Sequence, residues 1–331
     1  LFPTLIALAF AGYVIYLNFR GASSAAKLQA FLTKALLCGM LLAMGVSIFT
    51  GSPSNAMPVF SQVSGAGGGV AATESGNLLA GIVSVLVLTP FFYAGFDTIP
   101  QQAEEAAEGL NWNKFGKIIS LALLAAGGFY MVCIYSFGTI LPWDEFVSQP
   151  VPALACLKNI NMILYIAMLV IATLGPMGPM NSFYGATSRI MLAMGRKGQL
   201  PEKFAEVDEK SGAPKLACVV LAAITIVGPF LGKNMLIPLT NVSALAFIFS
   251  CTMVALACFK MRYTEPDLPR PYKVPGGKIG IGLAIAAGAI IIGLLVLPFS
   301  PACLNMVEWS IVIGWLVIGL ALMAFTKARS K

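Results

Sequence analysis

Long apolar stretches alternate with short polar ones along the whole chain. A helix needs about 20 mostly apolar residues to cross the hydrocarbon core of a bilayer. Nine windows meet this requirement: residues 1–18, 29–49, 78–96, 117–141, 161–187, 216–232, 235–259, 279–299 and 308–325. Each is apolar around its whole circumference, whereas transmembrane strands alternate between apolar and polar residues. The pattern predicts an all-α fold, a polytopic bundle of membrane-spanning helices.

Lysine and arginine gather in alternate loops. One set of loops, together with the end of the chain, holds Arg20, Lys27, Lys114, Lys117, Arg189, Arg196, Lys197, Lys203, Lys210, Lys215, Lys260, Arg262, Arg270, Lys273, Lys278, Lys327, Arg329 and Lys331. The other set holds only Lys158 and Lys233. Because short cytoplasmic loops are enriched in these residues, the chain is predicted to start outside and to end in the cytoplasm. The loop 50–77, rich in glycine at 65–69, is then an external connection and the candidate internal linker.

Composition supports a membrane protein and argues against other classes. The chain is 58% hydrophobic and 11% charged, against roughly 25% charged residues in a soluble domain. Its net charge of +7 follows from the loop asymmetry, so no nucleic-acid surface is expected. The seven cysteines form no CxxC pair and the chain contains no histidine, so we expect no metal site and no cofactor. The first residue is Leu1 and no signal peptide is recognisable, so an upstream truncation is expected.

The third window is interrupted where a membrane helix should continue. Pro90 loosens the first part, and Gly95 permits backbone angles that other residues resist. Thr98 resembles the cap of a new helix, with Gln101 placed to return a hydrogen bond. In transporters such a break lines the substrate cavity, because unpaired backbone groups are tolerated only beside protein or water.

Packing offers an alternative explanation of the same window. Gly95 allows close helix approach and Pro90 merely kinks the span in this interpretation, which the break alone supports equally. Asp97 favours the functional interpretation, since an acidic residue near the bilayer interior is a candidate functional group. Its ordinary role is that of a helix cap.

Lys34 lies inside the second window, with apolar residues continuing to Phe49. If the span begins near Leu28, the lysine is about two turns, or roughly 9 Å, into the helix. A snorkelling lysine is one explanation. The other is a lysine that stands in for a bound cation or exchanges a proton during transport.

The fifth window contains two Gly-Pro pairs, at Gly175-Pro176 and Gly178-Pro179, which distort its middle. Asn181 and Tyr184 follow three residues apart, so they share a helix face and are candidates to line a cavity. Hydrogen bonding between helices explains them equally well.

Three motifs resemble the amino acid–polyamine–organocation permease superfamily. Phe92–Asp97 with Ala103-Glu104-Glu105 resembles its sixth helix and that helix's acidic end. Thr187-Ser188-Arg189, Ala193–Arg196, Gly198–Pro201 and Phe204 resemble the end of its eighth helix and the following loop. Arg270–Pro275 resembles the stretch between its tenth and eleventh helices. The resemblance covers essentially the whole chain.

The resemblance implies a partial five-plus-five inverted-repeat (LeuT-like) transporter fold. Such permeases usually have twelve spans, and these nine match the fourth to the twelfth. Residues 1–50 then hold the last two helices of the first repeat, residues 78–260 the complete second repeat, and residues 279–325 two additional helices. The family's first helix, which supplies half of the substrate site, is expected to be missing.

The resemblance also assigns roles. Phe92, Tyr93, Ala94, Gly95 and Phe96 are expected to form the surviving half of the substrate site, with Asp97 and Asn181 as further candidates. Lys34 matches a lysine that takes the place of a sodium ion in relatives, which favours proton coupling or exchange over sodium coupling.

The expected function is therefore that of a secondary transporter for amino acids, working by alternating access in the plasma membrane. Its expected partners are a small amino acid or amine and the lipid bilayer. A polyamine permease of the same fold and an inactive structural fragment remain alternatives. A membrane enzyme or receptor is disfavoured, because the chain lacks a Ser/His/Asp set.

Overall fold

The computed structural model is built from helices, and it describes residues 2–20, 22–56, 78–101 and 111–329. Its α-helices are α1 (Phe2–Phe19), α2 (Ala22–Thr50), α3 (Leu78–Tyr93), α4 (Thr98–Gln101), α5 (Trp112–Gly138), α6 (Trp143–Ser148), α7 (Pro152–Ile160), α8 (Met162–Leu174), α9 (Met177–Arg196), α10 (Lys215–Val227), α11 (Leu236–Thr264), α12 (Gly277–Val296) and α13 (Met306–Arg329). No strand occurs among the described residues. The prediction of an all-α bundle is confirmed.

Seven spans in the described part of the chain are long and apolar enough to cross a membrane. Two more predicted windows appear as shorter apolar helices, Thr4–Phe19 and Lys215–Phe230. The glycine-rich centre of the predicted external loop and Ala103-Glu104-Glu105 lie outside the described residues. The chain is thus a polytopic helical membrane protein. Most of the predicted windows agree with the observed helices to within about five residues, whereas the fifth, predicted to end at residue 187, continues to Arg196.

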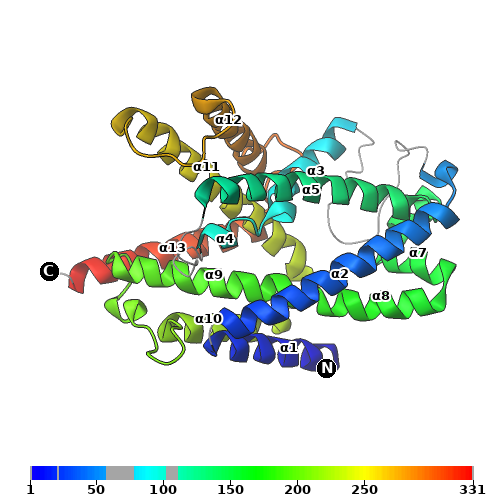
Figure 1. Ribbon diagram of the computed structural model, residues 1–331, viewed down its shortest axis with the longest axis horizontal. Coiled ribbons are helices and arrows are strands. Elements are labelled where there is room, and N and C mark those ends of the chain that lie inside the picture. The colour runs from blue at the N-terminus through cyan, green and yellow to red at the C-terminus, as the bar shows by residue number, and fades with distance from the viewer. Residues whose placement is uncertain (1, 21, 57–77, 102–110, 330–331) are drawn as a thin grey trace.

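The helices pack in two groups (Figure 1). One group contains α1, α2, α8, α9 and α10, with α2 lying against both α8 and α9 and α1 lying against α10. The other contains α3, α11, α12 and α13, with α11 at its centre. Helix α5 packs against α2 of the first group, and α4, which continues the span of α3, packs against α9. The broken span α3–α4 therefore bridges the bundle.

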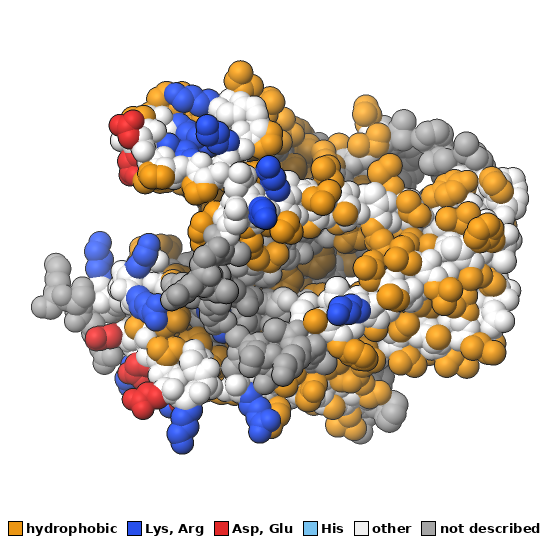
Figure 2. Space-filling view, viewed as in Figure 1, with side chains coloured by type: hydrophobic (Ala, Val, Ile, Leu, Met, Phe, Trp, Pro, Cys, Tyr) orange, Lys and Arg blue, Asp and Glu red, His pale blue; other side chains and the backbone are white. Residues whose placement is uncertain are grey.

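The outer surface shows the charge asymmetry of the sequence. In Figure 2 hydrophobic side chains cover most of the middle and right of the molecule, while the acidic residues and most of the lysine and arginine side chains lie in the left half. The left end also carries the C-terminus and is hollowed between the α11–α12 pair and the ends of α9 and α10. An apolar belt with charge at its end matches a protein surrounded by lipid.

Polar caps define several helix starts. Asn111 accepts hydrogen bonds from the main-chain N–H groups of Asn113 and Lys114, which begins α5. At α13, Asn305 and Glu308 form a reciprocal capping box, with the Asn305 N–H donating to Glu308 Oε2 at 2.7 Å. Glu308 is 2% exposed, and its Oε1 accepts a 2.6 Å hydrogen bond from Asn241 of α11. The cap of one helix thereby fastens it to its neighbour.

The connection between α11 and α12 is also fixed by polar contacts. The guanidinium of Arg270 donates to the main-chain carbonyls of Met261, Glu265, Pro266 and Leu268, at the C-terminal end of α11. A cation is favourable there because unpaired carbonyls give a helix end partial negative charge. Tyr272 lies across α5, with its hydroxyl 3.0 Å from Ser120 Oγ. A Cβ on Gly116 would lie 2.5 Å from that ring, so the missing side chain makes room for it.

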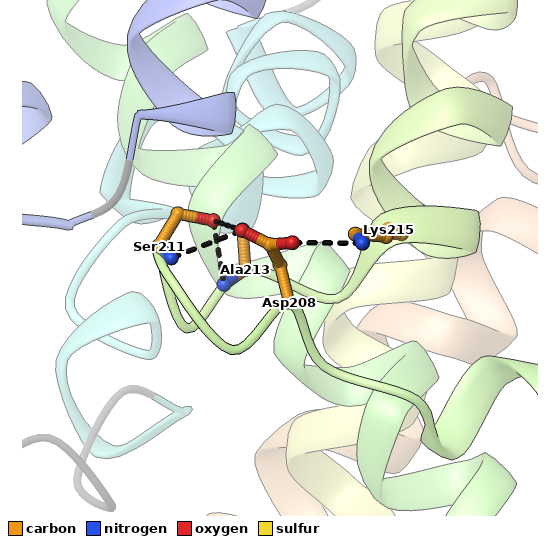
Figure 3. Close-up of polar contacts among 4 residues, drawn as sticks. All are labelled: Asp208, Ser211, Ala213 and Lys215. Atoms are coloured by element: carbon orange, nitrogen blue, oxygen red, sulfur yellow. Dashed lines mark hydrogen bonds and ion pairs between the residues drawn. The ribbon is translucent and has the colours of Figure 1, made fainter.

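A compact turn precedes α10 (Figure 3). Asp208 accepts hydrogen bonds from the N–H and hydroxyl of Ser211 at 3.0 and 2.9 Å, and pairs with the Lys215 ammonium at 2.7 Å. Gly212 has a φ of +67°, the left-handed conformation that glycine adopts readily. The ammonium of Lys215, followed by Ser211, lowers the pKa of the Asp208 carboxyl from 3.8 to about 2. Asp208 in turn raises the pKa of Lys215.

This turn predicts a pH-dependent stability difference. A carboxyl whose pKa is lower in the folded state stabilises the fold above its unfolded pKa, and the effect disappears as pH falls through the folded value. Asp208→Asn should therefore lower the melting temperature at pH 7 by about 1–2 °C, a small effect because the pair is exposed. The difference should shrink between about pH 4 and pH 2. Melting curves of Asp208→Asn and the control Glu209→Gln test this; equal melting temperatures at pH 7 would refute it.

Candidate functional site

The third predicted span is broken where the sequence indicated. Helix α3 ends at Tyr93, α4 begins at Thr98, and residues 94–97 form a turn between them. Gly95 has a φ of +129°, a conformation that residues with a side chain rarely adopt. A Cβ there would meet nothing within 4 Å, so backbone geometry, and not space, requires glycine. The alternative in which Gly95 serves close helix packing is therefore not supported.

The side chain of Asp97 holds the turn, and Thr98 does not act as the cap expected from the sequence. Asp97 Oδ1 accepts from the Gly95 N–H and Oδ2 accepts from the Gln101 side-chain amide, both at 3.0 Å. Thr98 instead donates its hydroxyl to the Gly95 carbonyl at 2.6 Å. The carboxylate of Asp97 therefore links the turn to the side chain of Gln101 in α4.

Aromatic rings surround the break. Tyr93 packs edge-on against Tyr130 of α5 with ring centres 5.9 Å apart, and Phe96 packs in the same way against Phe247 of α11. Phe92 is 48% exposed, while Tyr93, Ala94, Gly95, Phe96 and Asp97 are half-buried. The structure thus brings the six residues predicted in this segment together between α5 and α11.

Tyr130 was not singled out by the sequence. Its hydroxyl donates to the main-chain carbonyl of Phe92 at 2.8 Å. In an uninterrupted helix that carbonyl would accept from the N–H four residues later, which lies in the turn. The break removes the helical partner of the Phe92 carbonyl. A search for a hydrogen-bond donor on the next span, at the depth of that carbonyl, would have found Tyr130.

Asn181 faces a different part of the bundle. It is 5% exposed on α9 and accepts a 2.8 Å hydrogen bond from Asn18 of α1. Tyr184, one turn later, donates to the main-chain carbonyl of Cys218 in α10. Both contacts join helices, as in the alternative weighed from the sequence.

Lys34 is exposed on α2, within the span Gln29–Thr50. Gln29 lies closer to the bundle, where its amide is 3.5 Å from the position of a Cβ on Gly178 of α9. Its buried Oε1 has no hydrogen-bond partner among the described residues. A buried acceptor without a partner is unfavourable, so Gln29 is a further polar candidate near the interior.

The fifth span is distorted as predicted, with Gly175-Pro176 separating α8 from α9. Beside this distortion is a hollow of about 280 Å³ between α1, α9 and α10, lined mostly by apolar side chains such as Phe10, Pro176 and Met180. None of the predicted site residues lines it.

Comparison with known proteins agrees with this architecture. A family model described as amino acid permease matches residues 2–322. The branched-chain amino acid permease BcaP of Bacillus subtilis is 26% identical over 255 residues, which are 76% of this chain and 52% of the relative. The human cystine/glutamate transporter is 25% identical over 265 residues, 79% of this chain and 50% of the relative. A vacuolar cationic amino acid transporter of Arabidopsis thaliana is 29% identical over 184 residues, 54% of this chain and 27% of the relative.

The chain thus spans about half the length of the first two of these relatives. The match over residues 2–322 confirms the superfamily resemblance drawn from the three motifs and the prediction of a permease instead of an enzyme. On the strength of that match, and of a helical bundle with a broken span, this chain belongs to the amino acid permease family.

Proposed function

We propose that the full-length protein is a secondary transporter that moves amino acids across a membrane by alternating access. The observation that carries this proposal is the turn at residues 94–97 inside an apolar span. Main-chain groups released from helical hydrogen bonds are able to receive the charged ends of an amino acid. Phe92, Tyr93, Ala94, Gly95 and Phe96 are the proposed substrate contacts, and the half-exposed rings of Phe92 and Tyr93 are placed to cover the ligand.

The structure gives less support to a polyamine substrate. Asp97 would favour a polyamine if its carboxylate faced the ligand, whereas its two oxygens accept hydrogen bonds from the Gly95 N–H and from the side chain of Gln101. The curated relatives are described as transporters of branched-chain amino acids, of cystine and glutamate, and of cationic amino acids. We therefore propose an amino acid as the substrate, with Asp97 shaping the site and Asn181 supporting it through α9.

We also propose that α3 to α11 form the second repeat of the inverted-repeat fold, with residues 1–50 and 279–325 as the flanking parts predicted above. Its first member is the broken span, as the resemblance implies. The charge at the end that carries the C-terminus supports a cytoplasmic location for that end. The proposed compartment is the plasma membrane. A reporter that fluoresces only in the cytoplasm should be fluorescent when fused to the C-terminus, and loss of its fluorescence would contradict the orientation. Location of the fusion protein in the vacuole would contradict the proposed compartment.

Uptake by the purified full-length protein in proteoliposomes tests the function. Radiolabelled leucine, glutamate, arginine and putrescine should be compared with a proton gradient, with a sodium gradient, and with amino acid preloaded inside. We expect uptake of at least one amino acid that responds to the proton gradient or to preloading. Absence of uptake across the panel would support the structural-fragment alternative, and stimulation by sodium alone would refute the proposed coupling.

Lys34 provides a test of the coupling mechanism. Lys34→Ala should reduce gradient-driven uptake by about tenfold or more if the ammonium of Lys34, which lies within the apolar span Gln29–Thr50, replaces a bound cation or exchanges a proton. Lys34→Arg keeps a charge that does not titrate, so it should retain exchange but lose the response to pH. Lys260→Ala, at an exposed site near the end of α11, is the control. Unchanged pH dependence in Lys34→Ala would indicate that the side chain only snorkels to the membrane surface.

Gly95 provides a test of the break. Gly95→Ala strains a backbone held at a φ of +129°, at a cost of about 1–3 kcal/mol, and should weaken substrate binding about tenfold or more. Gly81→Ala on the same span has a helical backbone and open space, so it should bind normally. Equilibrium binding measured by scintillation proximity compares the two variants. Equal affinities would show that the conformation of Gly95 does not matter to the ligand.

A further inference from the structure

One face of α5 lies against the broken span. Gly127 and Tyr130 are three residues apart on this helix, so they occupy the same side of it. A Cβ on Gly127 would lie 2.5 Å from the hydroxyl oxygen of Tyr93, closer than such atoms approach. The missing side chain therefore forms a notch for the end of the Tyr93 ring. Gly128, the next residue, has open space around it.

Tyr130 holds the same segment through its hydroxyl. Its 2.8 Å hydrogen bond to the Phe92 carbonyl satisfies a group two residues before the turn. Its ring also packs against those of Phe92 and Tyr93, with centres 6.5 and 5.9 Å apart. Four contacts from one helix therefore hold the last turn of α3: the notch at Gly127, the hydrogen bond of Tyr130, and the packing of its ring against Phe92 and Tyr93.

We propose that Gly127 and Tyr130 are positioning residues that set the substrate affinity of the broken span. This inference rests on the proposed function, in which the main chain of residues 92–96 receives the ligand. Tyr130 occupies the Phe92 carbonyl, and Thr98 occupies the Gly95 carbonyl with its N–H and its hydroxyl. In this proposal a ligand ammonium binds the carbonyls of the neighbouring residues of the segment. Because Gly127 fixes the Tyr93 ring, the two residues together determine where those acceptors point.

The alternative is that Gly127 and Tyr130 serve only to pack α5 against α3 and have no effect on substrate affinity. Tyr130 is 40% exposed, and its hydroxyl pairs with a carbonyl that a regular helix would satisfy without it. Packing requires the ring alone, whereas positioning requires the hydroxyl. Removing the hydroxyl while keeping the ring separates the two explanations.

Transport kinetics of the full-length protein provide the first test. Tyr130→Phe should raise the KM for the transported amino acid about fivefold to tenfold, while the maximal rate per folded protein changes less than twofold, roughly the effect of one hydrogen bond. Tyr135→Phe is the control, since Tyr135 is 52% exposed on the same helix. Equal KM values for wild type and Tyr130→Phe would overturn the proposal.

A thermal double-mutant cycle provides the second test and needs no transport. Gly127→Ala should lower the melting temperature of the ligand-free protein, whereas Gly128→Ala should not. Adding Tyr93→Phe to Gly127→Ala should restore part of the loss, because the next ring atom is 3.7 Å from the added Cβ. If the changes in melting temperature caused by Gly127→Ala and Tyr93→Phe are additive, the inference that Gly127 makes room for the Tyr93 hydroxyl is wrong.

The two readouts distinguish the two proposals. A wild-type protein that takes up no amino acid, yet shows the thermal coupling, would overturn the proposed function and with it the role in affinity. A protein that transports normally, but in which Tyr130→Phe leaves the KM unchanged, would overturn the positioning role alone.

Discussion

The structure depends on one constraint, that main-chain polar groups inside a bilayer must find partners within the protein. Regular helices meet it by their own hydrogen bonds, and the broken span does not. The turn at residues 94–97 is held instead by the Asp97 carboxylate, the Thr98 hydroxyl and the Tyr130 hydroxyl. These side chains replace hydrogen bonds that the interruption removes from the helix, and they keep an irregular main chain in one conformation within an apolar span.

The same constraint explains polar groups elsewhere in the bundle. Asn18 and Asn181 pair across α1 and α9, and Asn241 binds the buried Glu308 between α11 and α13. Lipid supplies no hydrogen bonds, so such pairs give helices a preferred register that apolar packing alone leaves loose. Arg270 performs a comparable task at the end of α11, where its guanidinium adds hydrogen bonds to the carbonyls of Met261 and Glu265.

Hydrophobic length and loop charge were sufficient to predict the helical bundle, because both are properties of neighbouring residues. The break was predictable too, since Gly95 carries its own conformational signal. Partners distant in sequence were not. Tyr130 lies 38 residues from Phe92, and Asn18 lies 163 residues from Asn181, so which polar groups meet is decided by how helices pack. For the same reason the motif at Arg270 identified the family while its contacts with α11 and α5 appeared only in three dimensions.

Helix α5 has two places where a glycine admits a tyrosine from another element: Tyr272 at Gly116 and Tyr93 at Gly127. Eleven residues make about three full turns, so the two notches lie on nearly the same side of the helix, about 16 Å apart. A helix is stiff over this distance. A rotation of α5 about its axis would therefore displace the rings of Tyr93 and Tyr272 at the same time. Through α5, the turn in the broken span is mechanically linked to the connection between α11 and α12.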